Sequence, residues 1–468
     1  MKTKLIPLLV FFFLTGTTNT EACTIFSGKD KKGHVWAGNN EDFYFTFNSY
    51  LNLVARTDTT FGYMYLTYFS PDNYIQGGTN EAGLFFNGST TYPSEYKNYD
   101  MLKEFPGGSN QLLHHILKKC KTVPEVLSLF KKYRLQGLEA AQFHFADKYG
   151  NLGIIVSDSM WLTKSDYQIS TNYNLCHPNK DGINCWRFPI AERILSSKEP
   201  GFETFRSICD STSRKTRYST VYSNIHNLNT GEIWFFFGMD YSNSYHTDLK
   251  SLLENGSRSF FISELFDEQA IVKTYNTYHS SGYDMSLKVL DSYTISSERK
   301  TEILRLFIQD LILFNRDFNS YGYLESYMKT QKTPDEFSVT LNAIALFCLN
   351  RKNEALDILQ KYVSEKPNSI TAKEILNQMQ GIAPAGANAR FELKGYTSAK
   401  SVFVDGISVS PIYNFLTRDG DKWVGNFRLQ PNEYHYHFTV DGEKVLDQSN
   451  PDRVKDGENE FNKLIIYQ

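Results

Sequence analysis

The sequence predicts an α+β protein built as three successive regions, and the spacing of its apolar residues supports this class. Residues 23 to about 290 alternate short β-type runs with turn residues and a few amphipathic helical stretches. Residues 296–380 carry apolar residues at helical spacing, whereas residues 388–468 return to short strands separated by turns. Because strands and helices fall in separate runs, we expect antiparallel sheets in a layered first domain.

The stretch before residue 23 has the order of a secretory signal peptide. Two lysines precede an apolar run over residues 5–14, and small residues stand at Thr20 and Ala22. That run is too short to span a bilayer, and no other stretch approaches the about 18 apolar residues that a membrane helix needs. We therefore expect residues 1–22 to be removed and the chain, from Cys23, to be secreted or periplasmic. Lipidation of Cys23 is the alternative, although Thr20 stands where such signals usually have Leu.

Composition excludes some classes of partner. The chain has 468 residues, with 49 basic and 52 acidic residues interspersed, and a formal net charge of −3. No basic block is available to neutralise phosphates, so no nucleic acid is expected as a partner. Six cysteines are too few for a disulfide framework, but export allows a bridge, with Cys176 and Cys185 as the candidate pair. No histidine and cysteine spacing suggests zinc, and we expect no metal.

The first region, residues 23–293, contains segments with strand-type patterns and segments with helical patterns. Strand-type segments are rich in β-branched and aromatic residues and contain turn residues such as the Asn-Thr-Gly at positions 229–231. Helical segments have apolar residues at helical spacing and basic residues near their ends. The strand-type segments are 24–39, 151–158 and 219–238, and the helical ones are 108–120 and 122–133.

The second region, residues 296–380, predicts helices only. Residues 339–367 form two amphipathic helical stretches joined by a polar turn, and they resemble one tetratricopeptide repeat with small Ala343 and Ala355 at the close contacts. One repeat cannot bury its own apolar face, so we expect the preceding helices to stack on it. A helical spacer is favoured over a peptide-binding groove, which would need several matching repeats.

The last region, residues 388–468, follows a Gly/Ala/Pro linker and predicts an all-β domain. It resembles the immunoglobulin-like glycogen-binding module of amylolytic enzymes, so a glucan is a candidate partner. Where that module presents an exposed Trp, this chain has Tyr413 and Phe415, which could stack on a sugar. Aromatic residues at alternate strand positions are nevertheless more typical of a core, and Trp423 has the spacing of a packed residue too.

Cys23 stands at the expected cleavage point, and this position gives a thiol a particular chemistry. Cutting before Cys23 would leave a thiol, with an ordinary pKa of about 8.5, beside a new α-amine with a pKa of about 7.7–8.0. At neutral pH a fair fraction of that amine is unprotonated and can act as a general base. The cut would therefore create the base and expose the nucleophile together. A lone cysteine is otherwise most often a small buried hydrophobe.

Residues 23–42 resemble the start of the N-terminal nucleophile hydrolases of the choloylglycine hydrolase and penicillin V acylase family, to which acid ceramidase is related. That family has a nucleophilic Cys followed, about sixteen residues later, by Gly-Arg-Asn-x-Asp. Asp42 matches the Asp that binds the α-amine. Asn39 occupies the position of the Arg, which helps to lower the thiol pKa and holds the substrate carbonyl. Asn39 brings no charge, so the resemblance implies a less favoured thiolate here.

Two further blocks resemble this family. Residues 77–90 are similar to its Gly-x-Asn-Glu-x-Gly-Leu segment, in which an Asn lends an oxyanion donor, and the candidates here are Asn87 and Thr90. Residues 169–195 resemble the block that holds an oxyanion Asn and a late Arg. On that match Asn172 is the oxyanion donor and Arg187 the distal Arg, with Asn174 and Arg193 as the neighbouring alternatives.

The resemblance covers residues 23 to about 290 and implies a four-layer αββα sandwich and a linear-amide hydrolase without a cofactor. The substrate would be a small N-acyl amide, cleaved through an acyl-thioester on Cys23. Acyl transfer to an amine acceptor is the nearest alternative. A catalytically dead core that serves as a glycan-binding surface protein is another, and Asn39 is the residue that favours it.

Overall fold

The computed structural model describes residues 23–91, 94–176, 185–215, 218–266, 269–310, 312, 321–331, 334–407, 413–456 and 459–467. The proposed signal segment, residues 1–22, lies outside them. The described chain divides into two units, one running through Thr294 and the other from Ile295 onward, and each is described by itself. In the described residues no helix is both long enough and apolar enough to cross a membrane.

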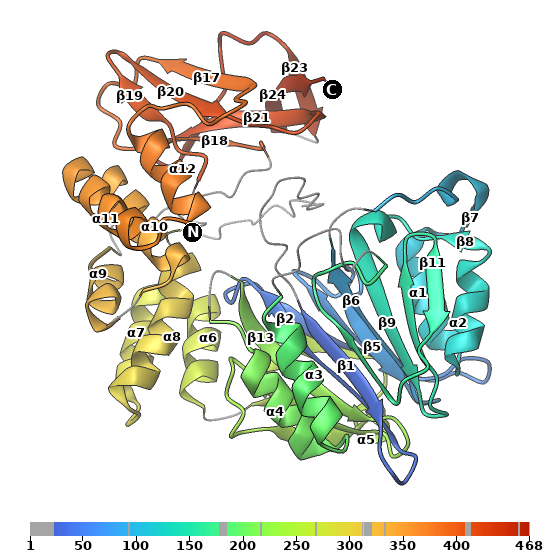
Figure 1. Ribbon diagram of the computed structural model, residues 1–468. Helices are drawn as coiled ribbons and strands as arrows, with labels where there is room; N and C mark the ends of the chain where they lie inside the picture. Colours follow the sequence, from blue (N-terminus) through green and yellow to red (C-terminus); the bar gives the residue numbers. More distant parts are fainter. Residues whose placement is uncertain are drawn as a thin grey trace. The chain divides into compact units, whose positions relative to one another are not determined.

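The first unit contains a six-stranded antiparallel sheet with β1 and β2 near its centre (Figure 1). These two strands form a hairpin whose turn contains Gly33 at a φ of 84°, a conformation that favours glycine. In sheet order the strands are β12 (Tyr167–Ser170), β1 (Thr24–Lys29), β2 (Val35–Phe43), β13 (Ser219–Asn227), β14 (Glu232–Phe237) and β15 (Tyr245–Asp248).

The second sheet of this unit has eight strands, and all its neighbouring pairs are antiparallel. In sheet order the strands are β11 (Ser159–Leu162), β10 (Leu152–Val156), β9 (Ala141–Asp147), β6 (Leu84–Thr90), β5 (Gly77–Asn80), β4 (Tyr63–Tyr68), β3 (Ser49–Val54) and β16 (Arg258–Phe261). The short strands β7 (Lys103–Glu104) and β8 (Tyr133–Arg134) pair with each other in parallel.

Helices cover the outer faces of both sheets. Helices α1 (Ser109–Lys119) and α2 (Val123–Phe130) share an apolar core with β4, β6, β9 and β10. Helices α3 (Arg187–Ser197) and α4 (Phe202–Thr212) share another with β1, β13 and β14. Between the sheets, Ile25 and Ala37 of the six-stranded sheet pack with Phe85 and Ala146 of the eight-stranded one. The layers therefore follow the order helix, sheet, sheet, helix.

Local sequence explains why α2 begins where it does. The Thr122 hydroxyl accepts from the backbone N–H of Glu125, whose carboxylate accepts in return from the backbone N–H of Thr122, and Pro124 occupies the first turn. The predicted helical segments 108–120 and 122–133 thus correspond to α1 and α2. The remaining elements of the unit are η1 (Tyr99–Met101), η2 (Leu138–Ala140), α5 (Leu249–Leu253), η3 (Ile262–Leu265), α6 (Ala270–Ser281) and α7 (Tyr283–Ser292).

The second unit opens with helices. Helix α10 packs against α9, α11 and α12, and Ala343 and Ala355 are fully buried at these contacts. The expected helix pair is therefore present, whereas its resemblance to a tetratricopeptide repeat stays a prediction. The helices are α8 (Ser297–Asp310), α9 (Tyr321–Thr330), α10 (Glu336–Cys348), α11 (Lys352–Glu365) and α12 (Ile370–Met379).

Two small sheets complete the second unit and share one core that includes Trp423 and Phe438. The buried Trp423 donates its ring N–H to the carbonyl of Tyr396 at 3.2 Å, which agrees with the packed role expected for it. The immunoglobulin-like topology stays a prediction. One sheet has β17 (Ala389–Lys394), β20 (Lys422–Phe427) and β19 (Thr417–Asp419), and the other has β18 (Val402–Asp405), β21 (Asn432–Val440), β22 (Glu443–Val445), β24 (Asn459–Ile466) and β23 (Arg453–Asp456).

The aromatic residues suggested for sugar stacking serve another purpose in this unit. Phe415 is only 1% exposed, and its ring centroid lies 5.3 Å from that of Phe347 on α10. The Tyr413 hydroxyl lies 3.2 Å from that of Thr340, also on α10. A stacking role for Phe415 is therefore wrong, because its ring is used to hold the β-sheets against the helices.

Candidate active site

Cys23 directly precedes β1 and faces the space between the two sheets. The register of β1 and β2 pairs Thr24 with Asn40, so Cys23 lies opposite Glu41 on the neighbouring strand. The thiol donates a hydrogen bond to Glu41 Oε1 at 3.1 Å. Both side chains are buried, with 3% of each exposed. The nucleophile proposed from the sequence therefore contacts a buried carboxyl group that the sequence analysis did not select.

Two amides hold the other oxygen of Glu41. Asn39 Nδ2 donates to Glu41 Oε2 at 3.0 Å, and Asn87 Nδ2 approaches the same oxygen at 3.5 Å from β6 of the opposite sheet. Asn87 fits because its strand partner is Gly77, where an added Cβ would lie 2.4 Å from Asn87 Nδ2. Cys23, Glu41, Asn39 and Asn87 thus form one hydrogen-bonded group, which we call the inner network.

A second group, the outer network, is built around Asp42. Because successive side chains of a strand point to opposite faces, Asp42 faces away from the inner network. Its Oδ2 accepts from Arg187 Nη1 at 2.8 Å, and its Oδ1 accepts from the Thr220 hydroxyl at 2.5 Å. Arg187 is the first residue of α3 and also donates to Asn172 Oδ1. Asn172 Nδ2 in turn donates to the Thr90 carbonyl at 2.9 Å.

All seven residues proposed from the sequence therefore lie in these two networks. Cys23, Asn39 and Asn87 belong to the inner one, and Asp42, Arg187, Asn172 and Thr90 belong to the outer one. The networks adjoin at the Glu41–Asp42 peptide, where a backbone hydrogen bond from Asp42 reaches the Cys23 sulfur.

The two alternatives named for the third block do not join these networks. Arg193 is exposed, and the Asn174 side-chain oxygen accepts from the backbone N–H of Cys176. The structure therefore favours Asn172 and Arg187 as the residues of this block that belong to the site.

The environment of Cys23 disfavours a resting thiolate. Burial raises the pKa of the Cys23 thiol well above its ordinary value, and the nearby charges of Glu41 and Asp42 raise it further. Asn39, at the position of the family's Arg, donates to Glu41 and supplies no positive charge. The guanidinium of Arg187 is bonded to Asp42. Burial is the first cause of the raised pKa, so the expected effect of Asn39 in place of an Arg stays a prediction.

Glu41 is perturbed in the same direction. Burial raises the pKa of its carboxyl group to about 8, and the hydrogen bonds from Cys23, Asn87 and Asn39 only partly oppose this effect. At neutral pH most of Glu41 is therefore protonated in the folded chain. The carboxyl group and the thiol then form a neutral, buried, hydrogen-bonded pair.

Two tyrosines lie close to this pair from different sheets. Tyr222 on β13 is the strand partner of Glu41, and Tyr68 on β4 contributes a ring whose centroid lies 6.4 Å from that of Tyr222. Burial, followed by the charge of Glu41, raises the pKa of both tyrosines well above the ordinary value. Within the described chain neither hydroxyl forms a hydrogen bond of good geometry. Both are therefore buried donors beside the nucleophile.

Sequence reasoning missed Glu41, Thr220, Tyr68 and Tyr222. One signal was available for Glu41, because counting back from the Gly turn of the predicted hairpin 24–39 places residue 41 opposite Cys23. The other three come from strands whose pairing depends on contacts far apart in the chain, such as the separation of 178 residues between Asp42 and Thr220.

The amide of Asn172, proposed as the oxyanion donor, is already engaged. Its Nδ2 donates to the Thr90 carbonyl at 2.9 Å and lies 3.4 Å from the Thr90 hydroxyl. An oxyanion role for Asn172 would therefore require this contact to Thr90 to open, whereas the tyrosine hydroxyls need to give up no partner of this kind.

Cys176 and Cys185, the candidate disulfide pair, are both free thiols in the structure. Cys185 precedes α3. Its burial acts to raise its pKa, but the charge of Arg187, the Thr171 hydroxyl and the backbone N–H of Phe188 outweigh burial and lower it. The sequence-based pairing is therefore not formed here.

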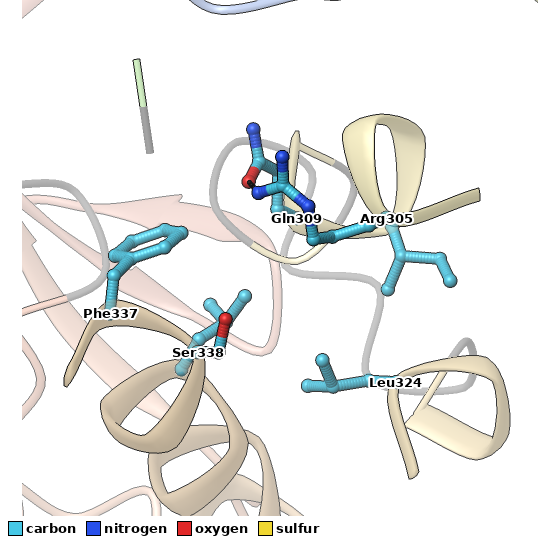
Figure 2. A pocket seen from close by; sticks show the side chains of 7 residues that line it. Arg305, Gln309, Leu324, Phe337 and Ser338 are labelled. Carbon is cyan, nitrogen blue, oxygen red and sulfur yellow. Dashed lines mark hydrogen bonds between the residues drawn. The ribbon is translucent and has the colours of Figure 1, made fainter. Parts of the chain in front are cut away.

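No group of three or more His, Cys, Asp or Glu among the described residues could hold a metal ion. A pocket among the helices of the second unit is lined mainly by aliphatic and aromatic carbon, and Arg305 donates to Gln309 at 3.2 Å across its wall (Figure 2). Among the described residues, its lining includes no Cys, His, Asp or Glu that could act as a nucleophile or base.

The solved structures that are similar to this chain include an acylase and two variants of a bile acid hydrolase. One is penicillin V acylase from Agrobacterium tumefaciens, at 14% identity and a TM-score of 0.38, with 51% of this chain and 90% of that chain covered. Two variants of conjugated bile acid hydrolase from Clostridium perfringens, each at 12% identity, match 51% of this chain and 96% of theirs, at TM-scores of 0.38 and 0.37.

No protein-family model and no curated protein matches the chain. TM-scores below 0.5 do not establish a common fold, so the function is inferred from the contacts of the site itself.

Proposed function

We propose that this protein is an exported cysteine amidase that cleaves a linear amide bond of a small N-acyl substrate, after removal of residues 1–22. The observation that carries the proposal is the position of Cys23. It precedes the first strand, its thiol donates to a buried carboxyl group at 3.1 Å, and a buried Asp–Arg pair lies on the opposite face of the adjacent strand.

The reaction begins with attack of the Cys23 sulfur on the amide carbonyl. The α-amine released by the cut accepts the thiol proton, because its pKa of about 7.7–8.0 leaves a fair fraction unprotonated at neutral pH. Collapse of the tetrahedral intermediate expels the amine and leaves an acyl-thioester on Cys23. Water then hydrolyses the thioester and restores the thiol.

The outer network gives Asp42 a fixed position for orienting that α-amine. The carboxylate is held by Arg187 at 2.8 Å and by Thr220 at 2.5 Å, so it has little freedom to rotate. A buried carboxylate with two such partners can orient a base in the way that the third member of a catalytic triad does. Arg187 is a positioning residue in this scheme, because it acts through Asp42.

The developing oxyanion needs hydrogen-bond donors inside the buried site. Asn172 is proposed as one donor, on condition that its contact with Thr90 opens when substrate binds. The hydroxyls of Tyr68 and Tyr222 are the other candidates, because they are buried beside Cys23 and have no partner of good geometry in the described chain. One such donor typically accounts for about 10²–10³-fold in kcat.

Mass spectrometry of the secreted protein tests this proposal. Intact mass reports the N-terminus, and peptide mass after treatment with iodoacetamide near pH 8 reports which thiols react. We expect a chain that begins at Cys23 and in which Cys23 is alkylated. A fully active chain that still carries residues before Cys23, or lipid on it, would contradict the mechanism.

A panel of N-acyl amides and conjugated bile salts then identifies the substrate. Cys23→Ser is the activity control and should abolish hydrolysis of every compound that the wild-type protein cleaves. Cys209→Ser is the matched control, because Cys209 is a buried thiol of α4 and has no proposed catalytic role. Equal activity of Cys23→Ser and the wild-type protein would exclude a Cys23 thioester.

A further inference from the structure

We propose that Glu41 and the aromatic rings beside it form a subsite for a positively charged group of the substrate, an ammonium close to the amide bond that is cleaved. This inference rests on the proposed amidase function and adds a class of substrate to it. The α-amine of Cys23 still takes the thiol proton, and Glu41 contacts the substrate only.

Glu41 lies where a substrate has to bind. Its Oε1 is 3.1 Å from the Cys23 sulfur, which must reach the amide carbon. When the thiol loses its proton it can no longer donate to Oε1, so this oxygen becomes free for another donor. An ammonium that forms a charge-assisted hydrogen bond of about 2.8 Å with Oε1 lies within about 6 Å of the sulfur. The positive charge is therefore only a few bonds from the amide.

The hydrogen-bond partners of Glu41 in the described chain are neutral. Asn39 and Asn87 donate amide N–H groups to Oε2, and the Cys23 thiol donates to Oε1. Within the described residues no Lys, Arg or His forms an ion pair with Glu41. A buried carboxylate normally has a positively charged partner, so a substrate that supplies one completes the site.

The other groups that face Glu41 bring no net positive charge. Asp42 follows it on β2 and is paired with Arg187 at 2.8 Å, so these two charges largely cancel. Tyr222 on β13 and Tyr68 on β4 have pKa values raised well above the ordinary value by burial, so both are neutral. The α-amine released by the cut is unprotonated when it acts as the base.

Aromatic rings next to the carboxyl group favour an organic cation. The ring of Phe43 stacks on that of Tyr68, with the centroids 4.4 Å apart, and the Tyr68 centroid lies 6.4 Å from that of Tyr222. The faces of aromatic rings carry partial negative charge and attract ammonium groups. Rings and carboxyl group together suit an alkylammonium and oppose a carboxylate.

Asn39 makes the subsite possible. The family resemblance has an Arg at this position, which would lie two residues from Glu41 on the same face of β2. Such a guanidinium would pair with Glu41 and repel a cation of the substrate. Asn39 instead donates a neutral amide to Glu41 at 3.0 Å. Asn at position 39 and Glu at position 41 thus leave a site that attracts positive charge.

Binding of the ammonium is coupled to release of a proton. Burial raises the Glu41 pKa to about 8, so the resting carboxyl group is mostly protonated at neutral pH. A positive charge in contact with it favours the ionised form, and the proton leaves to solvent. Below pH 8 the ionised fraction grows about tenfold per pH unit, so affinity for a cationic substrate should rise with pH and level off above about 8.

The experiment uses three amides of hexanoic acid that differ at the end of the amine half. The amines are ethylenediamine, propylamine and glycine, which end in an ammonium, a methyl and a carboxylate group. kcat/KM is measured between about pH 6 and 8.5 with a chain that begins at Cys23. At pH 8 we expect the ammonium amide to be preferred over the propylamide about 30-fold or more, and the glycine amide to be the poorest substrate. The preference should fall as the pH is lowered.

A second pair of amides shows which half of the substrate carries the charge. The propylamides of β-alanine and butanoic acid place an ammonium or a methyl group at the same point of the acyl half. A preference for the ammonium in this pair alone places the cation on the acyl side of the subsite. Each preference is a ratio of two substrates, so titration of the α-amine, which both share, cancels.

Three variants test the assignment to Glu41. Glu41→Gln keeps the shape of the side chain and removes its charge, so the preference should fall to about one and lose its pH dependence. Asn39→Arg places a guanidinium beside Glu41 and should lower the preference as well. Glu254→Gln removes an exposed carboxylate of the same unit and should retain the wild-type preference. A general loss of activity does not change these ratios.

The outcomes separate this subsite from the function on which it rests. A wild-type preference of one or below in both pairs would overturn the subsite and leave the amidase function intact, and this result needs no variant to fold. An unchanged preference in Glu41→Gln would overturn it too. If the mature chain cleaves no amide, or Cys23→Ser is as active as wild type, the amidase function fails, and the subsite fails with it.

Discussion

The two networks on opposite faces of β2 each contain a buried carboxyl group, and the partners that contact the two groups differ. Asp42, on the outer face, has a guanidinium at 2.8 Å and a hydroxyl at 2.5 Å. Glu41, the preceding residue on the inner face, has a thiol and two amides. A carboxylate with a cation partner can stay charged when buried, whereas one with only neutral partners is pushed toward its protonated form. Asp42 therefore has a positively charged partner, whereas the adjacent Glu41 contacts a thiol and two amides.

The contrast implies that the outer network holds a fixed charge and that the inner network holds a proton that can move. The outer network extends from Thr220 through Asp42 and Arg187 to Asn172, and each link joins a different element of the fold. The inner network ends at the thiol. A fixed charge suits positioning, and a proton that can leave suits a site that becomes charged only when a cation binds.

The largest expected effect concerns the pH dependence of stability. The folded Glu41 pKa of about 8 lies above its ordinary value, so the folded state prefers the protonated form. This stability is fully present below about pH 4.3 and is lost as the pH rises to about 8, by about 1.4 kcal/mol for each pH unit and up to about 5 kcal/mol in all. Urea unfolding at several pH values should show the loss in wild type and not in Glu41→Gln. Parallel curves for the two proteins would contradict it.

The next effect breaks the outer network. Arg187→Ala leaves the Asp42 carboxylate buried, with its main counter-charge removed, and should cost about 3–5 kcal/mol of unfolding free energy. Arg206→Ala is the matched control, because Arg206 pairs with Glu203 on the exposed side of α4. That control should cost less than about 1 kcal/mol. Chemical denaturation measures both, and a similar small loss in the two variants would show that the buried pair is not needed.

A smaller effect tests how the opposite sheet reaches the inner network. In Gly77→Ala the new Cβ would lie 2.4 Å from Asn87 Nδ2, so Asn87 must move away from Glu41. We expect a loss of about 1–3 kcal/mol together with a lower kcat. Gly322→Ala is the control, because an added Cβ there meets nothing within 4 Å. Unchanged stability and activity in Gly77→Ala would show that the Asn87 contact is dispensable.

The variant with the smallest expected effect on stability separates activity from stability. Tyr222→Phe removes a buried hydroxyl without a hydrogen-bond partner of good geometry in the described chain, so stability should hold or rise slightly. If that hydroxyl donates to the oxyanion, kcat should fall about 10²–10³-fold at a similar KM. Tyr241→Phe, which removes a 3.0 Å contact with Ser223, should instead cost about 1 kcal/mol of stability and leave kcat unchanged. Equal kcat in Tyr222→Phe and wild type would exclude the hydroxyl as a donor.

Much of the site could be chosen from short patterns. The spacing from Cys23 to Asp42 and the order of the later blocks selected seven residues, and all of them lie in the two networks. Helices α1 and α2 were also predictable, because the apolar spacing of both and the capping box of α2 are local properties. The catalytic roles of the seven residues stay proposals, since the contacts show where each side chain lies and not what it does.

The contacts of some side chains could not be predicted from short sequence patterns. In the sequence Glu41 is a charged residue in a polar stretch, and only the pairing of β1 with β2 shows that it lies opposite the Cys23 thiol. Phe415 was a candidate sugar platform until a helix covered its ring. Cys176 and Cys185 were candidates for a bridge on spacing alone, and both are free thiols.

The sequence by itself determined which residues are available for chemistry and on which face of a strand each one lies, because strand and helix periods are local. Only the tertiary structure decided which group each face meets. Arg187 reaches Asp42 across 145 residues of chain, and Asn87 reaches Glu41 from the opposite sheet. Whether a buried carboxyl group keeps a charge or a proton depends on those distant neighbours, because burial sets the cost of charge and only a partner in contact offsets it.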